Sequence, residues 1–378
     1  MKKYNYIFVL LLLINNSLIS CSFQIALFKK LNEKNKNLTI SPLSIFQALS
    51  LVSNGAKDET LKELLTLLDG KGLDEINEIN SKILSLMKEM SSLEIANAIM
   101  SKLSPLPKFS KIAKDKYSSE IQSLKSAKQV NNWCDKKTHG KITKIIDEID
   151  ERVFMIILNA VYFKGEWVNK FKKQSTTKKM FYNFNSQTSG KNVDMMQITS
   201  FFSYFEDSNL QAVRLPYEKD SISAIVILPK KDLNINEFIE LLDKDNEYFY
   251  SIIDNFKSNK VNLEMPKFEI TYSKSLKETL KDMGVNLAFS PKADFSNIRS
   301  QNDLMIDEVI HKTYLKVDEE GTEAAAITMI EMKLYSMAPQ FELIHYMKVN
   351  RPFLFILRKE DFPKNHDILF ISKIEKIN

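Results

Sequence analysis

The most distinctive segment of the sequence runs from Val317 to Pro339 and reads VDEEGTEAAAITMIEMKLYSMAP. Even-numbered positions from 322 to 332 hold uncharged residues, whereas odd-numbered positions from 323 to 333 hold all three charges. Side chains alternate between the two faces of a β-strand, so one face of this segment suits a sheet and the other suits water. This segment could therefore change its conformation, from an exposed loop to a strand inserted in a sheet. A surface helix formed by the alanine run is the alternative interpretation.

The sequence lacks the arrangements that catalysis or metal binding requires. Two cysteines, Cys21 and Cys134, exclude a disulfide scaffold and cysteine-rich zinc modules. Nucleophile-elbow, zinc-protease and nucleotide-binding motifs are absent, and the histidines show no ligand spacing. The four histidines are His139, His311, His345 and His366. We therefore expect no enzyme, no catalytic residues, no metal and no cofactor.

The elements that must position the distinctive segment alternate along the chain. Apolar residues at helical spacing predict a helix that starts at Ser41-Pro42 and further helices over 61–68, 76–90 and 276–283. Continuous or alternating apolar runs predict strands over 155–163, 222–228, 261–265, 353–357 and 368–374. Neither repeats nor a clear domain boundary interrupt this order. The pattern favours a single mixed domain.

The N-terminal residues have the layout of an export signal. Lys2 and Lys3 precede an apolar run from Ile7 to Ile14, and small residues follow at 20–22. The run is too short to span a bilayer, so residues 1–21 are predicted to be a signal peptide and the mature protein to be secreted. Residues 18–21, LISC, also resemble a lipoprotein cleavage box, which would anchor the protein through a lipid on Cys21. No transmembrane segment is expected.

Six sequence blocks, in order and covering about residue 23 to the end, resemble the serpins, the serine protease inhibitor family. The distinctive segment is similar to the family's reactive-centre hinge at Glu319, Gly321, Thr322, Glu323, Ala324, Ala325 and Ala326. The other blocks are 37–44, 159–167, 265–285, 351–355 and 368–370. The resemblance implies an α+β fold: one serpin-like domain over 22–378, with three β-sheets, eight or nine helices and an exposed reactive-centre loop at about 319–340.

The resemblance also implies a mechanism. A target serine protease attacks the loop and forms an acyl-enzyme, and the freed hinge inserts into the central sheet and traps the protease covalently. About ten inserted residues, each gaining about 0.5–1.5 kcal/mol per hydrogen bond, would yield on the order of 10 kcal/mol. That is comparable to the whole stability of a domain. Thr322, Ala324 and Ala326 are small and neutral, so insertion would bury no unpaired charge at the start of the hinge.

The position of the scissile bond decides the specificity. Counting about seventeen residues from Glu319, the spacing in the family, places the bond at Tyr335–Ser336. A tyrosine suits the apolar S1 pocket of chymotrypsin-like proteases. Cleavage after Leu334 would keep this class, whereas cleavage after Lys333 would make the target trypsin-like. A non-inhibitory member that acts as a carrier or chaperone is the remaining alternative.

Other matches concern control of sheet opening. Ser41, Ser44, Asn159 and His311 resemble the family's polar cluster that holds the sheet closed, and Trp167 resembles the aromatic residue where the loop enters. These residues would be structural switches and not catalysts.

The charge of the chain allows one further partner. The net charge is +5, and residues 101–145 hold eleven lysines against Asp115, Glu120 and Asp135. A solvated face in a lysine-rich protein is the favoured interpretation, and weak polyanion binding is the alternative. We expect a monomer with no nucleic-acid partner.

Overall fold

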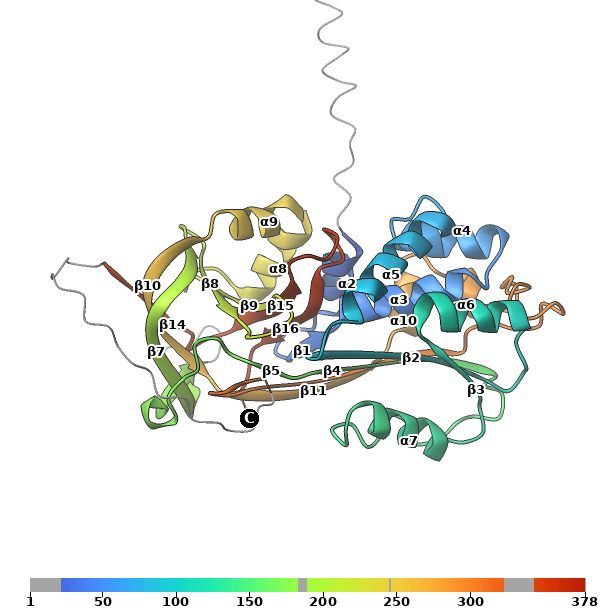
Figure 1. Ribbon diagram of the computed structural model, residues 1–378, viewed down its shortest axis with the longest axis horizontal. Helices are drawn as coiled ribbons and strands as arrows, with labels where there is room; N and C mark the ends of the chain where they lie inside the picture. The colour runs from blue at the N-terminus through green and yellow to red at the C-terminus, as the bar shows by residue number, and fades with distance from the viewer. Residues whose placement is uncertain (1–21, 183–188, 245, 323–342, 378) are drawn as a thin grey trace, which may run out of the picture.

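The computed structural model describes residues 22–182, 189–244, 246–322 and 343–377. Several helices gather at one end of the molecule, and a strongly curved sheet lies at the other (Figure 1). The α-helices of the described part are α2 (Phe23–Leu31), α3 (Pro42–Ser53), α4 (Asp58–Leu67), α5 (Leu73–Met87), α6 (Pro107–Tyr117), α7 (Ala127–Lys137), α8 (Ile235–Lys244), α9 (Asn246–Asp254) and α10 (Lys277–Asp282).

The strands of the described residues form three sheets. They are β1 (Leu38–Ile40), β2 (Leu93–Ser101), β3 (Glu120–Ser123), β4 (Met155–Phe163), β5 (Gly165–Glu166), β6 (Thr177–Tyr182), β7 (Gly190–Glu206), β8 (Leu210–Pro216), β9 (Ile222–Pro229), β10 (Lys257–Pro266), β11 (Phe268–Ser275), β12 (Glu308–Val317), β13 (Gly321–Thr322), β14 (Ile344–Lys348), β15 (Phe353–Lys359) and β16 (Ile368–Ile374). The expected α+β architecture with three sheets is confirmed.

A five-stranded sheet, here called the central sheet, has the order β11-β12-β4-β2-β3. A nine-stranded sheet has the order β1-β16-β15-β9-β8-β7-β10-β14, with β6 paired to β7. The two-stranded third sheet pairs β13 with β5. The strands β4 and β9 are buried on both faces almost throughout, as their continuous apolar runs predict.

The parallel pair β4 and β12 lies at the middle of the central sheet. Their ladder runs from Glu308 opposite Ile156 to Thr313 opposite Val161. Beyond this point β12 continues to Val317 and β4 to Phe163 without pairing to each other. The two strands are therefore direct neighbours along one end and separate at the end that leads to β13.

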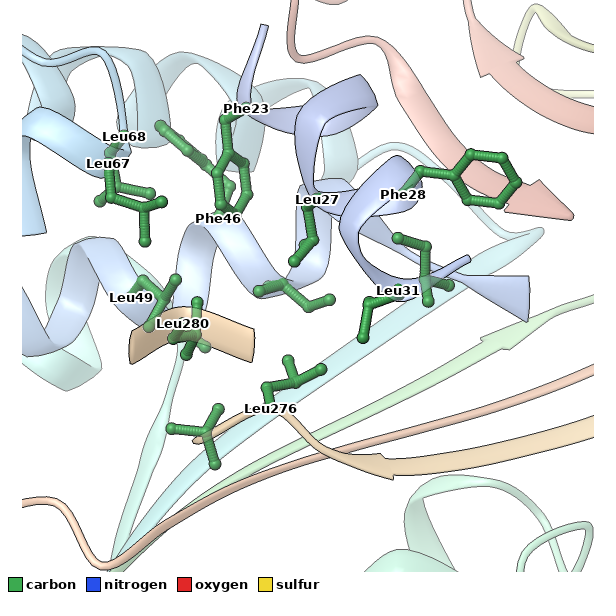
Figure 2. Packing of buried hydrophobic residues seen from close by; sticks show 14 of the residues in the cluster. Phe23, Leu27, Phe28, Leu31, Phe46, Leu49, Leu67, Leu68, Leu276 and Leu280 are labelled. Carbon is green, nitrogen blue, oxygen red and sulfur yellow. The ribbon is translucent and has the colours of Figure 1, made fainter. Parts of the chain in front are cut away.

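Helix α3 supports one face of the central sheet. The Ser41 side chain accepts a hydrogen bond from Ser44 N at 3.4 Å, and Pro42 occupies the first turn, which is the position that tolerates proline best. All twelve residues of α3 are buried. Figure 2 shows Phe46 and Leu49 of this helix packed with Phe23 and Leu27 of α2. This core fixes the position of the polar residues at the start of α3.

Helix α7 covers the opposite face of the central sheet (Figure 1). Trp133 and Cys134 of α7 belong to a buried cluster with Leu158 of β4 and with Ile310 and Tyr314 of β12. Cys134 is fully buried, and burial raises the pKa of its thiol to about 12. A strand that enters between β4 and β12 must therefore pass beneath α7.

Candidate functional site

The carboxylate of Glu319 fixes the chain just after β12 ends. Its side chain is 4% exposed. One carboxylate oxygen lies 2.9 Å from Lys267 Nζ, and the other accepts a 2.7 Å hydrogen bond from Thr176 Oγ1. Burial acts to raise the pKa of Glu319, but the Lys267 and Thr176 contacts outweigh it and hold the pKa below the ordinary value. Glu319 therefore stays ionised and anchors the hinge.

Gly321 and Thr322 form β13 and pair with Glu166 and Gly165 of β5. Gly321 has a φ of +151°, and a Cβ there would lie 2.1 Å from Gly165 O. Only glycine fits this approach of two backbones. Thr322 is fully buried, with its hydroxyl 2.7 Å from the Tyr217 hydroxyl.

Trp167 binds the same stretch of chain from the side. Its indole Nε1 donates to Asp318 O at 3.0 Å, and its backbone N–H donates to Glu320 O at 2.9 Å. Its ring stacks on Tyr217, with 4.2 Å between ring centroids and an interplanar angle of 26°. We call Glu319, Thr322, Trp167, Tyr217 and Lys267 the hinge anchor. It sits where β4 and β12 separate.

The expectation that the exposed loop begins at about residue 319 is wrong for its first residues. Glu319, Gly321 and Thr322 are buried, because each has partners from β5, β10–β11 or the loop after β5. The remaining predicted loop residues lie outside the described residues, and they are Glu323, Ala324, Ala325, Ala326, Lys333, Leu334, Tyr335 and Ser336.

A second polar cluster lies beneath the paired part of β4 and β12. His311 Nδ1 on β12 lies 2.6 Å from Asn159 Oδ1 on β4. The other ring nitrogen, Nε2, accepts a 3.1 Å hydrogen bond from Ser41 N. The Asn159 amide donates to Ser44 Oγ and, at 2.6 Å, to Asn97 Oδ1 on β2. The structure thus brings together all four predicted residues of this cluster and adds Asn97. We call these five residues the sheet clasp.

The sheet clasp needs a neutral histidine. A backbone N–H can only donate, so Nε2 of His311 must be free of a proton and Nδ1 must carry it toward Asn159. Complete burial lowers the pKa of His311 from 6.5 to about 3. The clasp therefore holds β4 and β12 together through uncharged hydrogen bonds and weakens when His311 is protonated.

Sequence reasoning missed several partners in both places. Tyr217 follows the end of β8, Thr176 precedes β6, and Asn97 lies in the middle of β2. Tyr217 and Thr322 are 105 residues apart, and Thr176 and Glu319 are 143 apart. No local pattern signals such distant pairs. Lys267 lies inside a block that resembles the family, but no sequence pattern assigns it an ion pair.

Comparison with known proteins agrees with this geometry. The family model for serpins, serine protease inhibitors, matches residues 19–377. Intracellular coagulation inhibitor 2 of Tachypleus tridentatus is 31% identical over 374 residues, which cover 94% of this chain and 89% of that protein.

Solved structures match over nearly the whole chain. Tengpin, a thermophilic serpin in its native state, has a TM-score of 0.83 at 31% identity, with 95% of this chain and 93% of that chain covered. Human thyroxine-binding globulin has a TM-score of 0.83 at 26% identity, with 95% and 98% covered. The chain is therefore not an enzyme but a member of the serpin family of serine protease inhibitors.

Proposed function

We propose that the protein is a suicide-substrate inhibitor of chymotrypsin-like serine proteases, cleaved at Tyr335–Ser336. The observation that carries the proposal is the separation of β4 and β12 beyond Thr313 and Val161, directly beside the buried start of the hinge. Thr322, the last described residue before the loop, lies beside the gap into which the following residues would insert. Their alternation of small neutral and charged positions suits a strand with one face in the core.

The trapping reaction follows from ordinary protease chemistry. The protease serine attacks the Tyr335 carbonyl, the peptide bond to Ser336 breaks, and the new amine of Ser336 leaves with the proton from the catalytic histidine. Tyr335 is then held to the protease as an ester. Insertion of the hinge gains backbone hydrogen bonds on both sides and pulls on that ester. Loss of one oxyanion-hole donor alone slows a hydrolase by about 10²–10³-fold, which would stop deacylation.

Incubation with chymotrypsin and with trypsin tests the proposal. We expect a covalent complex with chymotrypsin that survives boiling in SDS, and a released C-terminal fragment that begins at Ser336 by mass spectrometry. A fragment that begins at Tyr335 would keep the specificity class, since the bond cut would follow Leu334. A fragment that begins at Leu334, with trypsin as the trapped protease, would contradict the specificity. Simple cleavage without a complex would favour a carrier or chaperone.

We further propose that the protein is exported by cleavage near residue 21. The proposal rests on the N-terminal sequence of this chain alone, which lies outside the described residues. The Tachypleus relative does not support export, since it is named as intracellular. No helix of the described part is long and apolar enough to cross a membrane. The N-terminal sequence of protein recovered from the medium of expressing cells tests export. Recovery in the membrane fraction with a lipid on Cys21 would indicate an anchored protein.

Weak binding of a sulfated polyanion is a second proposed activity. Lys108, Lys111 and Lys114 are exposed at helical spacing along α6, so they share one face. The nearby Glu120 is already paired with Lys137 at 2.6 Å. Retention on a heparin column that falls steeply with salt, and falls further when the three α6 lysines are replaced by alanine, would support this activity. The control variant replaces Lys57, Lys62 and Lys71 by alanine. If the α6 variant and this control variant elute at the same salt concentration, the result would contradict polyanion binding through α6.

A further inference from the structure

The outward face of β7, β10 and β14 carries an unusual share of the exposed apolar surface. Among the described residues six large hydrophobic side chains are exposed, and three of them are Phe201, Leu343 and Tyr346. Their exposed fractions are 56%, 76% and 61%. These strands lie at the end of the molecule away from α4 and α6 (Figure 1). Isolated exposed apolar residues are normal, but a gathering on one face marks an interaction surface.

The strand registers place Phe201 and Tyr346 on a common face. Phe201 of β7 pairs with Lys260 of β10, which pairs in turn with Ile344 of β14. Two residues further along the strands, Tyr346 is paired with Asn262, so it points to the same side of the sheet. The Asn262 side chain donates a 2.7 Å hydrogen bond to Thr199. Paired residues of neighbouring strands point to the same side of a sheet. We call Phe201, Ile344 and Tyr346 the outer sheet patch, and the exposed Leu343 directly precedes it in the chain.

The backbone under the patch is held in place. Tyr346 O accepts a 3.0 Å hydrogen bond from Gln211 Nε2, and the His345 ring packs against Tyr204 with 4.9 Å between centroids. Met347, which points inward, is fully buried. The exposed aromatic rings therefore stand on a rigid strand, so a partner would bind them without first ordering the backbone.

Chain length brings the protease to this patch. Only seven residues lie between Ser336 and Ile344, so the proposed scissile bond lies within about 29 Å of the patch even if the connection is fully extended. A globular domain of about 200 residues has a radius of gyration of about 16 Å. A protease bound at Tyr335 is therefore wide enough to cover β14.

The charge around the patch defines the chemistry of that partner surface. Lys348 is exposed on the outward face, and the one carboxylate of these rows, Glu264, is already paired with Lys179 at 3.1 Å. The face is thus apolar with a positive border. An apolar protease surface bordered by carboxylates would complement it.

We propose that the outer sheet patch is a second contact surface for the target protease, which binds beside the loop and selects among enzymes that share the same S1 specificity. The inference rests on the proposed inhibitory function. Phe201 and Tyr346 are its central residues, because buried aromatic side chains dominate protein interfaces. The exposed Lys348 accelerates encounter with an acidic partner.

Kinetics of chymotrypsin inhibition test the inference with the double variant Phe201→Ala/Tyr346→Ala. We expect the second-order rate constant to fall at least about tenfold, which is the effect of losing interface aromatics. The fraction of inhibitor that ends in SDS-stable complex should not change, because the hinge is untouched. The matched control is Phe154→Ala, an exposed phenylalanine that directly precedes β4 of the central sheet, a different sheet from that of the patch. This variant should inhibit at the wild-type rate.

A cross-linking variant covers the case in which the alanine variant does not fold. Tyr346→p-benzoylphenylalanine, irradiated with chymotrypsin whose nucleophilic serine is replaced by alanine, should cross-link to the protease. A double variant that inhibits at the wild-type rate would overturn the inference. A double variant that inhibits faster than wild type would also overturn it, because the patch would then hold this chain's own loop. A cross-link to a second copy of the chain would overturn it as well. If wild-type protein forms no complex at all, the proposed function itself fails, and that outcome is visible without any variant.

Discussion

His311 and Asn159 join the two strands that must separate before a third can enter between them. His311 Nδ1 lies 2.6 Å from Asn159 Oδ1, directly across the β12–β4 ladder. Both side chains are buried, and both hold further partners from α3 or β2. We propose that the sheet clasp sets the barrier to opening, because insertion between the two strands would have to break this contact.

Removing Asn159 should lower that barrier. Asn159→Ala leaves His311 Nδ1 and Asn97 without a partner, and each unsatisfied buried group costs about 1–3 kcal/mol. We expect the half-life of inhibitory activity at 45 °C to shorten at least about tenfold, since 1.4 kcal/mol corresponds to one decade in rate. Activity and native gel mobility would be followed together. The control Asn192→Ala changes an exposed asparagine on β7 and should leave the half-life unchanged; equal half-lives for the two variants would contradict the role of the clasp.

Acid should weaken the clasp in a defined pH range. Because the pKa of His311 is lowered to about 3 in the folded state, the unfolded chain takes up a proton below pH 6.5 that the folded chain does not. The contribution of such a histidine to the free energy of unfolding is therefore fully present above pH 6.5. It decreases as the pH drops, by about 2 kcal/mol per such histidine at pH 5. Burial also lowers the pKa of His366, to about 4, with the same sign. Urea midpoints between pH 7 and pH 5 should thus depend on pH about half as strongly in His311→Gln as in wild type. An unchanged slope would show that His311 does not titrate in this way.

A charge at Thr322 should convert the inhibitor into a substrate. Thr322 is fully buried between Tyr217 and β5, so an arginine there would bring a charge into a site with no exposed surface. With Thr322→Arg we expect chymotrypsin to cut the loop at a near-normal rate while the SDS-stable complex falls to a small fraction. Thr322→Ser keeps the hydroxyl and should trap normally. Trapping by the arginine variant at the wild-type yield would argue against insertion through this position.

Replacing Tyr335 should redirect the specificity. Tyr335→Arg presents a cation to S1, which the acidic pocket of trypsin-like enzymes accepts and an apolar pocket does not. Inhibition of chymotrypsin should fall by at least about 10²-fold, and inhibition of trypsin should appear, since a misplaced charge costs several kcal/mol. Rate constants against both enzymes give the answer. If the protease instead cuts the bond that follows Lys333 or Leu334, the arginine at 335 will leave the choice of protease unchanged.

Local patterns predicted the elements well where burial is uniform along them. The apolar run 155–163 predicts β4 with the bounds that the structure has, Met155–Phe163. The helix predicted over 76–90 is Leu73–Met87, because Gly72 ends the preceding turn and two acidic residues favour the first turn that follows it. Element ends depend on such caps more than on periodicity, so they shift while the element itself is predicted correctly.

The site was predicted only in part. The family resemblance predicted His311 and Asn159. Their direct contact depends on the parallel register of β4 and β12, which no sequence pattern fixes. The burial of Thr322 in the uncleaved chain was not foreseen. Its cause is the Tyr217 hydroxyl together with the backbone of β5, and both become neighbours of Thr322 only after the sheets assemble.

Differential scanning calorimetry of intact protein and of protein nicked in the loop by a non-target protease tests the central claim most directly. If the uncut chain stores on the order of 10 kcal/mol that insertion releases, the nicked form should melt at a temperature at least about 20 °C higher. The N-terminal and C-terminal fragments should remain associated throughout. A nicked form that melts at the same temperature as the intact one, or below it, would contradict the proposal that the loop inserts between β4 and β12.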